Sequence, residues 1–180
     1  AAVELGKLLG ARVIACASSE QKRAVALAHG AELVLGADEF REQVNAFTAG
    51  RGADVIFDPV GGDVFDQSLK CIAFEGRILP IGFAGGRVPQ IPANILLVKN
   101  ASVLGLNLAT YFGRGISDER KIHAPRVQAM MAQLIEWAKT GRIKPTVADC
   151  FDLSEYAQAM DAVLGRRSVG KVALRMNDPT

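Results

Sequence analysis

The chain has 180 residues, of which 49% are hydrophobic and 22% charged, and its formal net charge is +2. This length and apolar content are sufficient for one domain with a hydrophobic core and an appended segment. The nearly balanced charge and the lack of a basic block argue against nucleic acid as the main partner. No apolar run approaches the roughly 20 residues that span a bilayer. Glu4 and Lys7 interrupt the apolar start, so we expect neither a signal peptide nor a membrane segment.

The three cysteines, Cys16, Cys71 and Cys150, are far apart in the sequence, form no CxxC pair and have no histidine nearby. Zinc ligands commonly occur in such close pairs, and we therefore predict no metal site. We interpret the cysteines as reduced side chains that serve as small apolar residues. Reduced cysteines are typical of the cytoplasm, which is the localisation that we expect.

The first part of the chain alternates helical patterns with short apolar runs. Predicted helices cover residues 1–10, 20–29, 38–49 and 63–74, and predicted strands cover residues 12–17, 32–35, 53–57, 77–81 and 102–108. The strand at 53–57 (ADVIF) is nearly continuous in apolar residues, which is typical of a strand buried on both faces. Strands that alternate with helices pair in parallel through right-handed crossovers. The predicted fold class is therefore α/β, with a doubly wound parallel (Rossmann) sheet.

The opening helix is unusual for this fold class. A dinucleotide-binding unit normally places a strand and a glycine-rich phosphate loop before its first helix, and the helix at 1–10 follows neither. We therefore expect a sheet that lacks its first strand and glycine loop, in a chain that corresponds to the later part of a larger nucleotide enzyme. The missing strand would lie between those at 12–17 and 53–57. Its absence leaves two apolar edges beside a gap, so we expect the isolated fragment to be unstable or rearranged.

The pattern changes after Tyr111. The segment 82–92, rich in glycine and proline, is predicted to be a loop, and residues 117–140 a long helix that Pro125 starts or kinks. We interpret the apolar side of this helix, including Met130 and Met131, as core packing. A strand at 145–151, a helix at 154–164 and a strand at 171–175 follow. We divide the chain into a truncated dinucleotide-binding domain, residues 1–112, and a segment that returns to another domain, residues 113–180.

The first strand end places hydroxyl groups directly before a helix. Ligands of open α/β sheets bind outside the carboxyl ends of the strands, where an NAD site usually has Asp or Glu for the ribose hydroxyls. This chain has Ser18 and Ser19 there, followed by the cations Lys22 and Arg23. Hydroxyls, helix amides and a cation together favour binding of a 2′-phosphate. The serines can also be helix caps, since Ser18 with a glutamine three residues later fits a capping box, and the two interpretations are compatible.

Three further strand ends carry glycine turns, at residues 58–62 (DPVGG), 81–86 (IGFAGG) and 105–107 (GLN). Glycine lets the backbone approach a flat ligand, and proline removes an amide that would extend the strand ladder. One such turn is weak support for a binding site. Three turns at successive strand ends indicate a shared ligand cleft.

The chain resembles the medium-chain dehydrogenase/reductase superfamily in segments that occur in the same order: GARVIACASSEQKRAVALAHGAELVL, GADVIFDPVGGDVFDQSL, GRILPIGFAGG, ASVLGLNL, and GRIKPTVADCFDLSEYAQAMDAV with GKVALRM. Within it, the chain is most similar to the zinc-free quinone oxidoreductase branch, related to zeta-crystallin. The resemblance implies an NADPH-dependent enzyme that passes hydride to quinones or other α,β-unsaturated carbonyl compounds without a metal.

The resemblance also implies cofactor contacts at the strand ends. They are Ser18, Ser19 and Lys22 for the 2′-phosphate, Pro59, Val60 and Gly61 for the adenosine and ribose, and Ile81, Gly82, Phe83, Ala84, Leu106, Asn107 and Leu108 for the nicotinamide. Two positions depart from the pattern. Residues 36–38 (GAD) replace a tyrosine that many relatives place against the adenine, and Pro59 stands where serine is frequent. No catalytic residue is assigned, because we expect His29 and His123 to be structural or solvated.

Two other functions remain open. A zinc-dependent alcohol dehydrogenase relative would have its metal ligands mostly outside this sequence, and a non-enzymatic nucleotide-binding module would need only the strand-end turns. A methyltransferase-like sheet is disfavoured because it usually has an acidic residue where this chain has Ser18 and Ser19.

The end of the predicted sheet indicates how the protein assembles. Residues 101–108 would form an edge strand, and edge strands are commonly covered by a partner. The resemblance implies a homodimer through this edge. The partners that we expect are therefore a quinone or enone substrate and a second copy of the protein.

Overall fold

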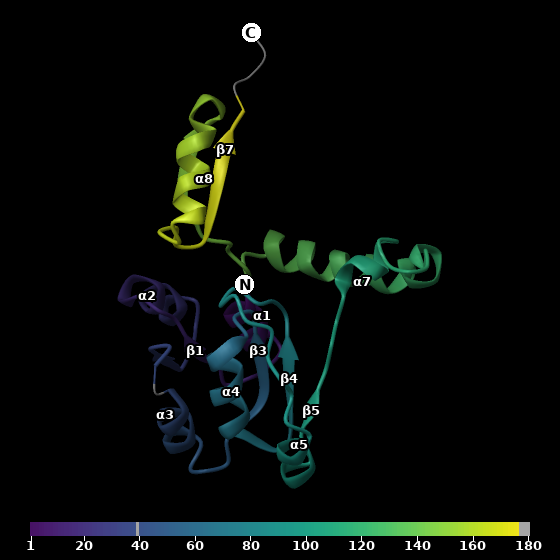
Figure 1. The fold of residues 1–180 in the computed structure, drawn as a ribbon. Coiled ribbons are helices and arrows are strands. Elements are labelled where there is room, and N and C mark those ends of the chain that lie inside the picture. The colour runs from purple at the N-terminus through teal and green to yellow at the C-terminus, as the bar shows by residue number, and fades with distance from the viewer. Residues whose placement is uncertain (39, 177–180) are drawn as a thin grey trace.

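The predicted helices and strands occur in the predicted order, and the structure adds the helices α5 (Ala93–Lys99) and α6 (Leu108–Tyr111) and the 3₁₀ helix η1 (Leu153–Glu155), which the sequence did not predict. The computed structural model describes residues 1–38 and 40–176, so residue 39 of the predicted helix at 38–49 and the last four residues of the predicted C-terminal segment lie outside it. The elements are α1 (Ala2–Leu8), β1 (Ile14–Cys16), α2 (Glu20–Ala28), β2 (Leu33–Leu35), α3 (Phe40–Phe47), β3 (Ala53–Asp58), α4 (Gly62–Lys70), β4 (Ile72–Pro80), α5 (Ala93–Lys99), β5 (Ser102–Val103), α6 (Leu108–Tyr111), α7 (Arg120–Lys139), β6 (Val147–Asp152), the 3₁₀ helix η1 (Leu153–Glu155), α8 (Tyr156–Leu164) and β7 (Lys171–Arg175) (Figure 1).

All strand pairs among the described residues are parallel. They form three sheets with the orders β1-β2, β3-β4-β5 and β6-β7. Ile14 pairs with Leu33 in the first sheet, and Ile56 pairs with Ile78 in the second. The alternation of helices with parallel strands confirms the predicted α/β fold class. β1 and β3 do not pair with each other, so the sheet is interrupted where the sequence predicts a missing strand.

Two strands differ in length from their predictions. β4 begins at Ile72 and includes the end of the predicted helix at 63–74, because the amide of Ala53 donates to the carbonyl of Cys71 at 2.8 Å and draws this apolar segment into the sheet. β5 ends at Val103, although a strand was expected through residue 108. The side chain of Asn107 accepts a hydrogen bond from the amide of Ala109 at 3.1 Å and begins α6, which ends the extended conformation.

Two clusters of buried side chains form the core. The first contains Leu35, Phe40, Val44 and Cys71, and Ile14, Leu33, Ala53 and Val64 pack against it. The second contains Phe65, Leu69, Ile72 and Ile78, and Ile56, Ile95, Leu96, Ala101 and Val103 pack against it. The first cluster joins β1 and β2 to the beginning of β3, and the second covers the β3-β4-β5 sheet with α4 and α5. Each large apolar side chain buried in this way contributes about 1.5–3 kcal/mol.

The prediction that the strand at 53–57 is buried on both faces is wrong. Val55 and Phe57 are 52% and 53% exposed, whereas Ile56 packs against the second cluster. The predicted burial assumed a complete sheet with helices on both of its faces. In the described part of the chain, β3 has a neighbouring strand on one side alone.

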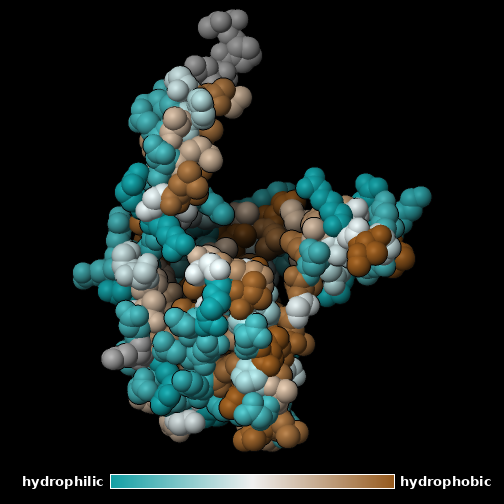
Figure 2. Space-filling view, in the orientation of Figure 1, coloured by the Kyte–Doolittle hydropathy of each residue, from teal (hydrophilic) through white to brown (hydrophobic). Residues whose placement is uncertain are grey.

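The segment after α6 extends away from the first two sheets. In Figure 1, α7 points to one side, and α8 with β7 rises above the body. Met130 and Met131 are 43% and 44% exposed, so the prediction that they fill a core is wrong for this structure, in which apolar surface is visible along α7 (Figure 2). Pro125 lies inside α7 rather than at its start. No helix among the described residues is both long and apolar enough to cross a membrane.

A glycine is required at the start of β3. Gly52 has φ +86°, and a Cβ at this position would lie 2.6 Å from the carbonyl oxygen of Cys71 and 2.9 Å from the amide nitrogen of Ala73. Gly50 provides a matched control, since it also has positive φ (+81°) but has no atom within 4 Å of an added Cβ.

We expect Gly52→Ala to lower the free energy of unfolding more than Gly50→Ala does. Both substitutions force alanine into the left-handed region, at about 1–2 kcal/mol, but only Gly52→Ala presses a methyl group against the backbone of the α4–β4 junction. Urea unfolding of both variants, followed by circular dichroism, measures the difference. Equal losses would contradict the proposed close packing.

Candidate cofactor site

Two strand-end turns lie against each other at the carboxyl edge of β3 and β4. Amides on the β4 side donate to carbonyls on the β3 side in three hydrogen bonds, from Ile81 to Asp58 at 2.7 Å, from Ala84 to Pro59 at 3.1 Å, and from Gly85 to Val60 at 2.8 Å. The structure therefore brings the predicted positions 59–61 and 81–84 into one continuous patch of backbone.

Glycine permits this close approach. A Cβ at Gly61, where φ is +70°, would lie 3.0 Å from the carbonyl oxygen of Arg87, and a Cβ at Gly82 would lie 3.2 Å from that of Pro59. Distances this short leave little room for a side chain, so the backbone itself forms the surface. Such a surface suits a flat ligand, as the sequence predicts for these turns.

Asp58 organises the first turn. Its side chain is 2% exposed, and Oδ1 accepts hydrogen bonds from the amides of Val60 at 2.8 Å and Gly61 at 3.0 Å. The other oxygen, Oδ2, is buried and has no hydrogen-bond partner among the described residues. Leaving such a group unpaired costs about 1–3 kcal/mol, more if it is charged. From the sequence, Asp58 was predicted only to begin a turn, although an Asp side chain commonly accepts a hydrogen bond from the backbone amide two residues later.

The serines before α2 have different roles. Ser19 is the N-cap of α2 and accepts a long hydrogen bond of 3.3 Å from the amide of Lys22. The interpretation of Ser18 as the first residue of a capping box is therefore wrong, because the helix begins one residue later. Ser18 is exposed and precedes the cap at the carboxyl end of β1.

Three cations make hydrogen bonds to backbone carbonyls near the carboxyl ends of β1 and β4. The Lys22 ammonium donates to the carbonyl of Arg166 at 3.0 Å, and the Arg23 guanidinium donates to the carbonyl of Ala17 at 3.0 Å. The Arg166 guanidinium in turn donates to the carbonyl of Ala84 at 2.7 Å. Arg166 therefore links the helix after β1 to the turn after β4, where its guanidinium places a positive charge.

Arg166 is a residue of this edge that the sequence does not predict. This residue lies 144 positions after Lys22 and has a left-handed backbone with φ +55° between α8 and β7. Its only sequence signal is a pair of arginines before a predicted strand, which does not say what the arginines contact.

The predicted positions after β5, Leu106 to Leu108, are not hydrogen-bonded to the other predicted positions of the site. β5 follows β4 as far as Leu104, whose amide donates to the carbonyl of Ile78 at 2.9 Å. Beyond it, Leu106 and Leu108 are exposed, and Asn107 caps α6. In residues 1–38 and 40–176, no hydrogen bond connects these three residues to the turns at 59–61 or 81–84.

His29 joins distant segments, whereas His123 makes a local contact within its own helix. His29 contacts Glu4 through Nδ1 at 3.1 Å and Thr146 through Nε2 at 2.6 Å. Burial alone would raise the pKa of Glu4, but hydrogen bonds from the Lys144 amide and His29 outweigh it, so that the pKa of this carboxyl is lowered. His123 contacts Glu119 at 3.1 Å, one helical turn away.

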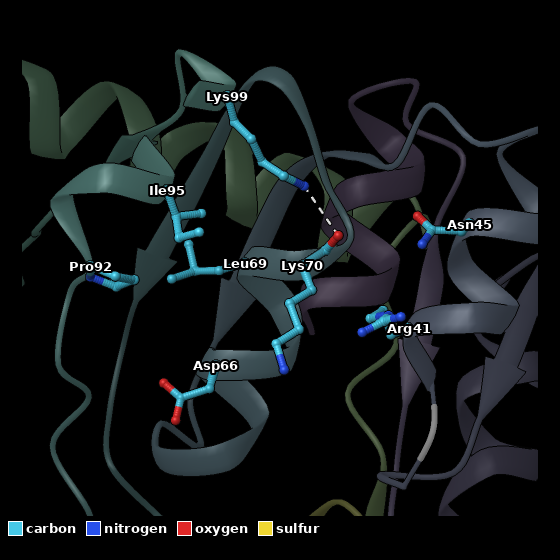
Figure 3. A pocket seen from close by; sticks show the side chains of 8 residues that line it. All are labelled: Arg41, Asn45, Asp66, Leu69, Lys70, Pro92, Ile95 and Lys99. Carbon is cyan, nitrogen blue, oxygen red and sulfur yellow. Dashed lines mark hydrogen bonds between the residues drawn. The ribbon is translucent and has the colours of Figure 1, made fainter. Parts of the chain in front are cut away.

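A pocket of about 490 Å³ lies between α3, α4 and α5, outside this site. It is lined by Arg41, Asn45, Asp66, Leu69, Lys70, Pro92, Ile95 and Lys99 (Figure 3). Lys70 and Lys99 are the last residues of α4 and α5, which places them toward the amino edge of the sheet. The Lys99 ammonium donates to the carbonyls of Lys70 at 3.1 Å and Ile72 at 3.0 Å, which stabilises the helix end. We therefore assign this pocket no part in the cofactor site.

Comparison with known proteins identifies relatives along nearly the whole chain. The family model described as "Zinc-binding dehydrogenase" matches residues 1–123. The "Quinone oxidoreductase-like protein 2 homolog" of Nematostella vectensis is 40% identical over 179 residues, which cover 97% of this chain and 46% of that protein. The chain thus spans about half the length of the curated relatives that it matches.

Solved structures agree with the sequence comparison. A quinone oxidoreductase of Pseudomonas syringae pv. tomato has a TM-score of 0.79 at 26% identity, with 96% of this chain and 51% of that chain covered. A mycobacterial protein complexed with NADPH has a TM-score of 0.77 at 26% identity, with 96% and 52% covered. The family match over the greater part of the chain, together with the parallel α/β fold, shows that the chain belongs to the zinc-binding dehydrogenase family of the medium-chain dehydrogenase/reductase superfamily.

Proposed function

We propose that this chain forms the NADPH-binding part of an oxidoreductase that transfers hydride to quinones or other α,β-unsaturated carbonyl compounds. The observation that supports the proposal most is the carboxyl edge, where Ser18 and Ser19 precede α2 and the ammonium of Lys22 donates to the backbone carbonyl of Arg166. An edge with hydroxyls and cations, and without a carboxylate at the strand end, favours a phosphorylated ribose over a free one.

The 2′-phosphate end of the proposed site consists of Ser18, Ser19, Lys22 and Arg166. Ser18 donates from its exposed hydroxyl, the first amides of α2 point outward, and Lys22 supplies a cation one turn into the helix. Arg166 is fixed at Ala84 and raises the positive potential of the same edge. NADPH, when bound, supplies the hydride.

The other positions form the remainder of the proposed site. Pro59, Val60 and Gly61 present backbone to the adenosine and ribose, and Ile81 to Ala84 present backbone to the nicotinamide. The side chains of Ile81, Phe83, Leu106 and Leu108 are exposed and apolar, so they exclude water from the reacting carbons once the cleft is closed. Asn107 lies among them as the cap of α6. Positioning in a desolvated cleft is the main contribution of the chain to hydride transfer.

We further propose that the enzyme works without zinc, in the cytoplasm, with residues 1–112 as a dinucleotide-binding domain and residues 113–180 as a segment that joins the substrate domain. The wide spacing of the cysteines supports the absence of zinc, and their free thiols support the cytoplasmic location. The division into two parts is supported by α7 and the β6-β7-α8 unit, which extend away from the first two sheets (Figure 1). The description of the matching family favours the alternative, a zinc-dependent dehydrogenase.

The first prediction from the proposed function concerns cofactor choice. We expect NADPH to raise the melting temperature of the full-length parent protein more than NADH, and Lys22→Ala to abolish the difference, because one charge-assisted hydrogen bond contributes about 1.5–3 kcal/mol. Arg166→Ala should act in the same direction. Lys139→Ala, at the end of α7, serves as the control for loss of one positive charge. Equal protection of the unsubstituted protein by both cofactors would contradict the 2′-phosphate site.

The second prediction concerns the reaction. We expect the full-length parent to oxidise NADPH in the presence of 1,4-benzoquinone, measured by loss of NADPH absorbance, and this chain alone to show no turnover. Incubation with a zinc chelator should leave the rate unchanged. A rate that falls on chelation and returns with zinc would favour the zinc-dependent alternative.

The third prediction concerns assembly. We propose a homodimer through the β5 edge and the residues after it, 101–108, where Leu104 and Leu106 are exposed. Light scattering should give a dimer for the full-length parent, and Leu104→Glu should shift it toward monomer because a charge would be buried at the interface. Leu9→Glu, at an exposed leucine after α1, is the matched control. A monomeric parent would refute this interface.

A further inference from the structure

The pocket between α3, α4 and α5 lies apart from the candidate cofactor site. Its volume is about 490 Å³, which is within the range of about 300–1,000 Å³ that is typical of small-molecule sites. α4 and α5 end beside it with Lys70 and Lys99, toward the amino edge of the sheet. A ligand in this pocket therefore leaves the strand-end turns at the carboxyl edge free.

The two sides of the pocket differ in polarity. The side chains of Leu69, Pro92 and Ile95 form an apolar wall on one side (Figure 3). Arg41 and Asn45, both from α3, lie on the opposite side. Small-molecule sites commonly combine apolar walls with a few polar groups that orient the ligand. This arrangement suits a molecule with one apolar end and one polar end.

The charge of the lining indicates the sign of the polar end. Four charged residues line the pocket, of which Arg41, Lys70 and Lys99 are cations and Asp66 is an acid, so the lining has a net charge of +2. Asp66 is already hydrogen-bonded to the guanidinium of Arg87 at 2.7 Å, outside the pocket. The lining therefore favours an anion.

Two of the three cations have hydrogen-bonding capacity left. The Lys99 ammonium is held by the two carbonyls to which it donates. Arg41 contacts Glu42 through Nε at 3.1 Å, and its terminal nitrogens have no partner within residues 1–38 and 40–176. In the same part of the chain, the Lys70 ammonium has neither a hydrogen bond nor an ion pair. Both groups can therefore donate to the oxygens of an anion.

A neighbouring hollow limits where the anion can lie. It has a volume of about 440 Å³ and shares Arg41 and Lys70 with the pocket, but it is also lined by the acids Asp38 and Glu42. These carboxylates repel a negative charge that extends in their direction. The charged group of the ligand is therefore confined to the side of the pocket that faces the apolar wall.

We propose that this pocket binds a small organic anion, with one phosphate or carboxylate group on a compact apolar body. Arg41 and Lys70 bind the charged oxygens, Asn45 donates from its side-chain amide, and the apolar body packs against the apolar wall. A guanidinium can donate two parallel hydrogen bonds to such a group, and an ammonium adds a point charge. The site shares no residue with the proposed cofactor site, so it goes beyond the proposed function.

The test measures binding of three model compounds to the full-length parent protein in the presence of excess NADPH. Phenyl phosphate and phenylacetate carry the two charged groups on the same ring, whereas benzyl alcohol carries the ring without a charge. We expect saturation-transfer NMR titrations to give a dissociation constant on the order of 1 mM for at least one of the anions. Benzyl alcohol should bind at least about tenfold more weakly. The tighter anion identifies the charged group of the ligand.

Substitutions distinguish the pocket from other cationic surfaces. Lys70→Met and Arg41→Gln should each weaken binding of the tighter anion at least about fivefold, because each removes a charged donor. Lys139→Met is the matched control, since Lys139 is likewise the last residue of a helix. Lys22→Ala, in the proposed 2′-phosphate site, should leave binding unchanged, which keeps the result independent of the proposed function. Thermal unfolding followed by circular dichroism verifies that each variant is folded.

Three results would overturn the proposal. One is that neither anion binds. Another is that benzyl alcohol binds as tightly as the anions, which would make the pocket an apolar hollow without charge recognition. Neither of these results requires a variant. The last is that Lys22→Ala or Lys139→Met weakens binding as much as Lys70→Met and Arg41→Gln do, which would place the anion elsewhere.

Discussion

The parallel pairing of β3 with β4 is the interaction on which the rest of the structure depends. It aligns Ile56 with Ile78, and α4 and α5 bury the second core cluster against this pair. The same ladder continues past the strands into the two turns, where three backbone hydrogen bonds fix the candidate cofactor surface. Gly52 allows the α4–β4 junction to close against the start of the pair. The same β3-β4 pair therefore forms part of the core along its length and positions the candidate cofactor surface at its carboxyl end.

The segment after α6 is attached to the body by polar contacts, whereas the sheets are held by apolar ones. Glu4 accepts from the amide of Lys144, and His29 reaches Thr146. Partly exposed polar contacts of this kind contribute little individually. The apolar side chains of α7 remain exposed, as Figure 2 shows, so this segment has the composition of an element that packs against another domain.

Most elements could be predicted from local patterns, because helical periodicity and apolar runs are properties of short windows. α2 and β7 lie within a residue of their predicted bounds, and the interruption of the sheet was foreseen from the absence of a strand before α1. The errors occur where a residue's state depends on distant neighbours. Residues 72–74 continue a helical pattern but belong to β4, where Ile72 pairs with Ala53 of β3. Phe57 and Met130 are apolar side chains of the kind found in cores, but both are exposed.

The candidate site shows the same division. The strand-end turns were identified from glycine and proline, whose backbone preferences act locally. Asp58 and Arg166 were not identified from the sequence. The role of Asp58 depends on its burial, and that of Arg166 on a contact with Lys22, which lies 144 positions away.

The hydrogen bonds of Arg166 have a consequence for how such enzymes diverge. The loop before β7 touches both Lys22 and the turn after β4, so the last part of the chain closes over the edge that the first part builds. Under the proposed function, cofactor preference is a joint property of two segments that lie far apart in the sequence. An exchange of the β1-α2 segment between relatives would then transfer that preference only together with the loop between α8 and β7.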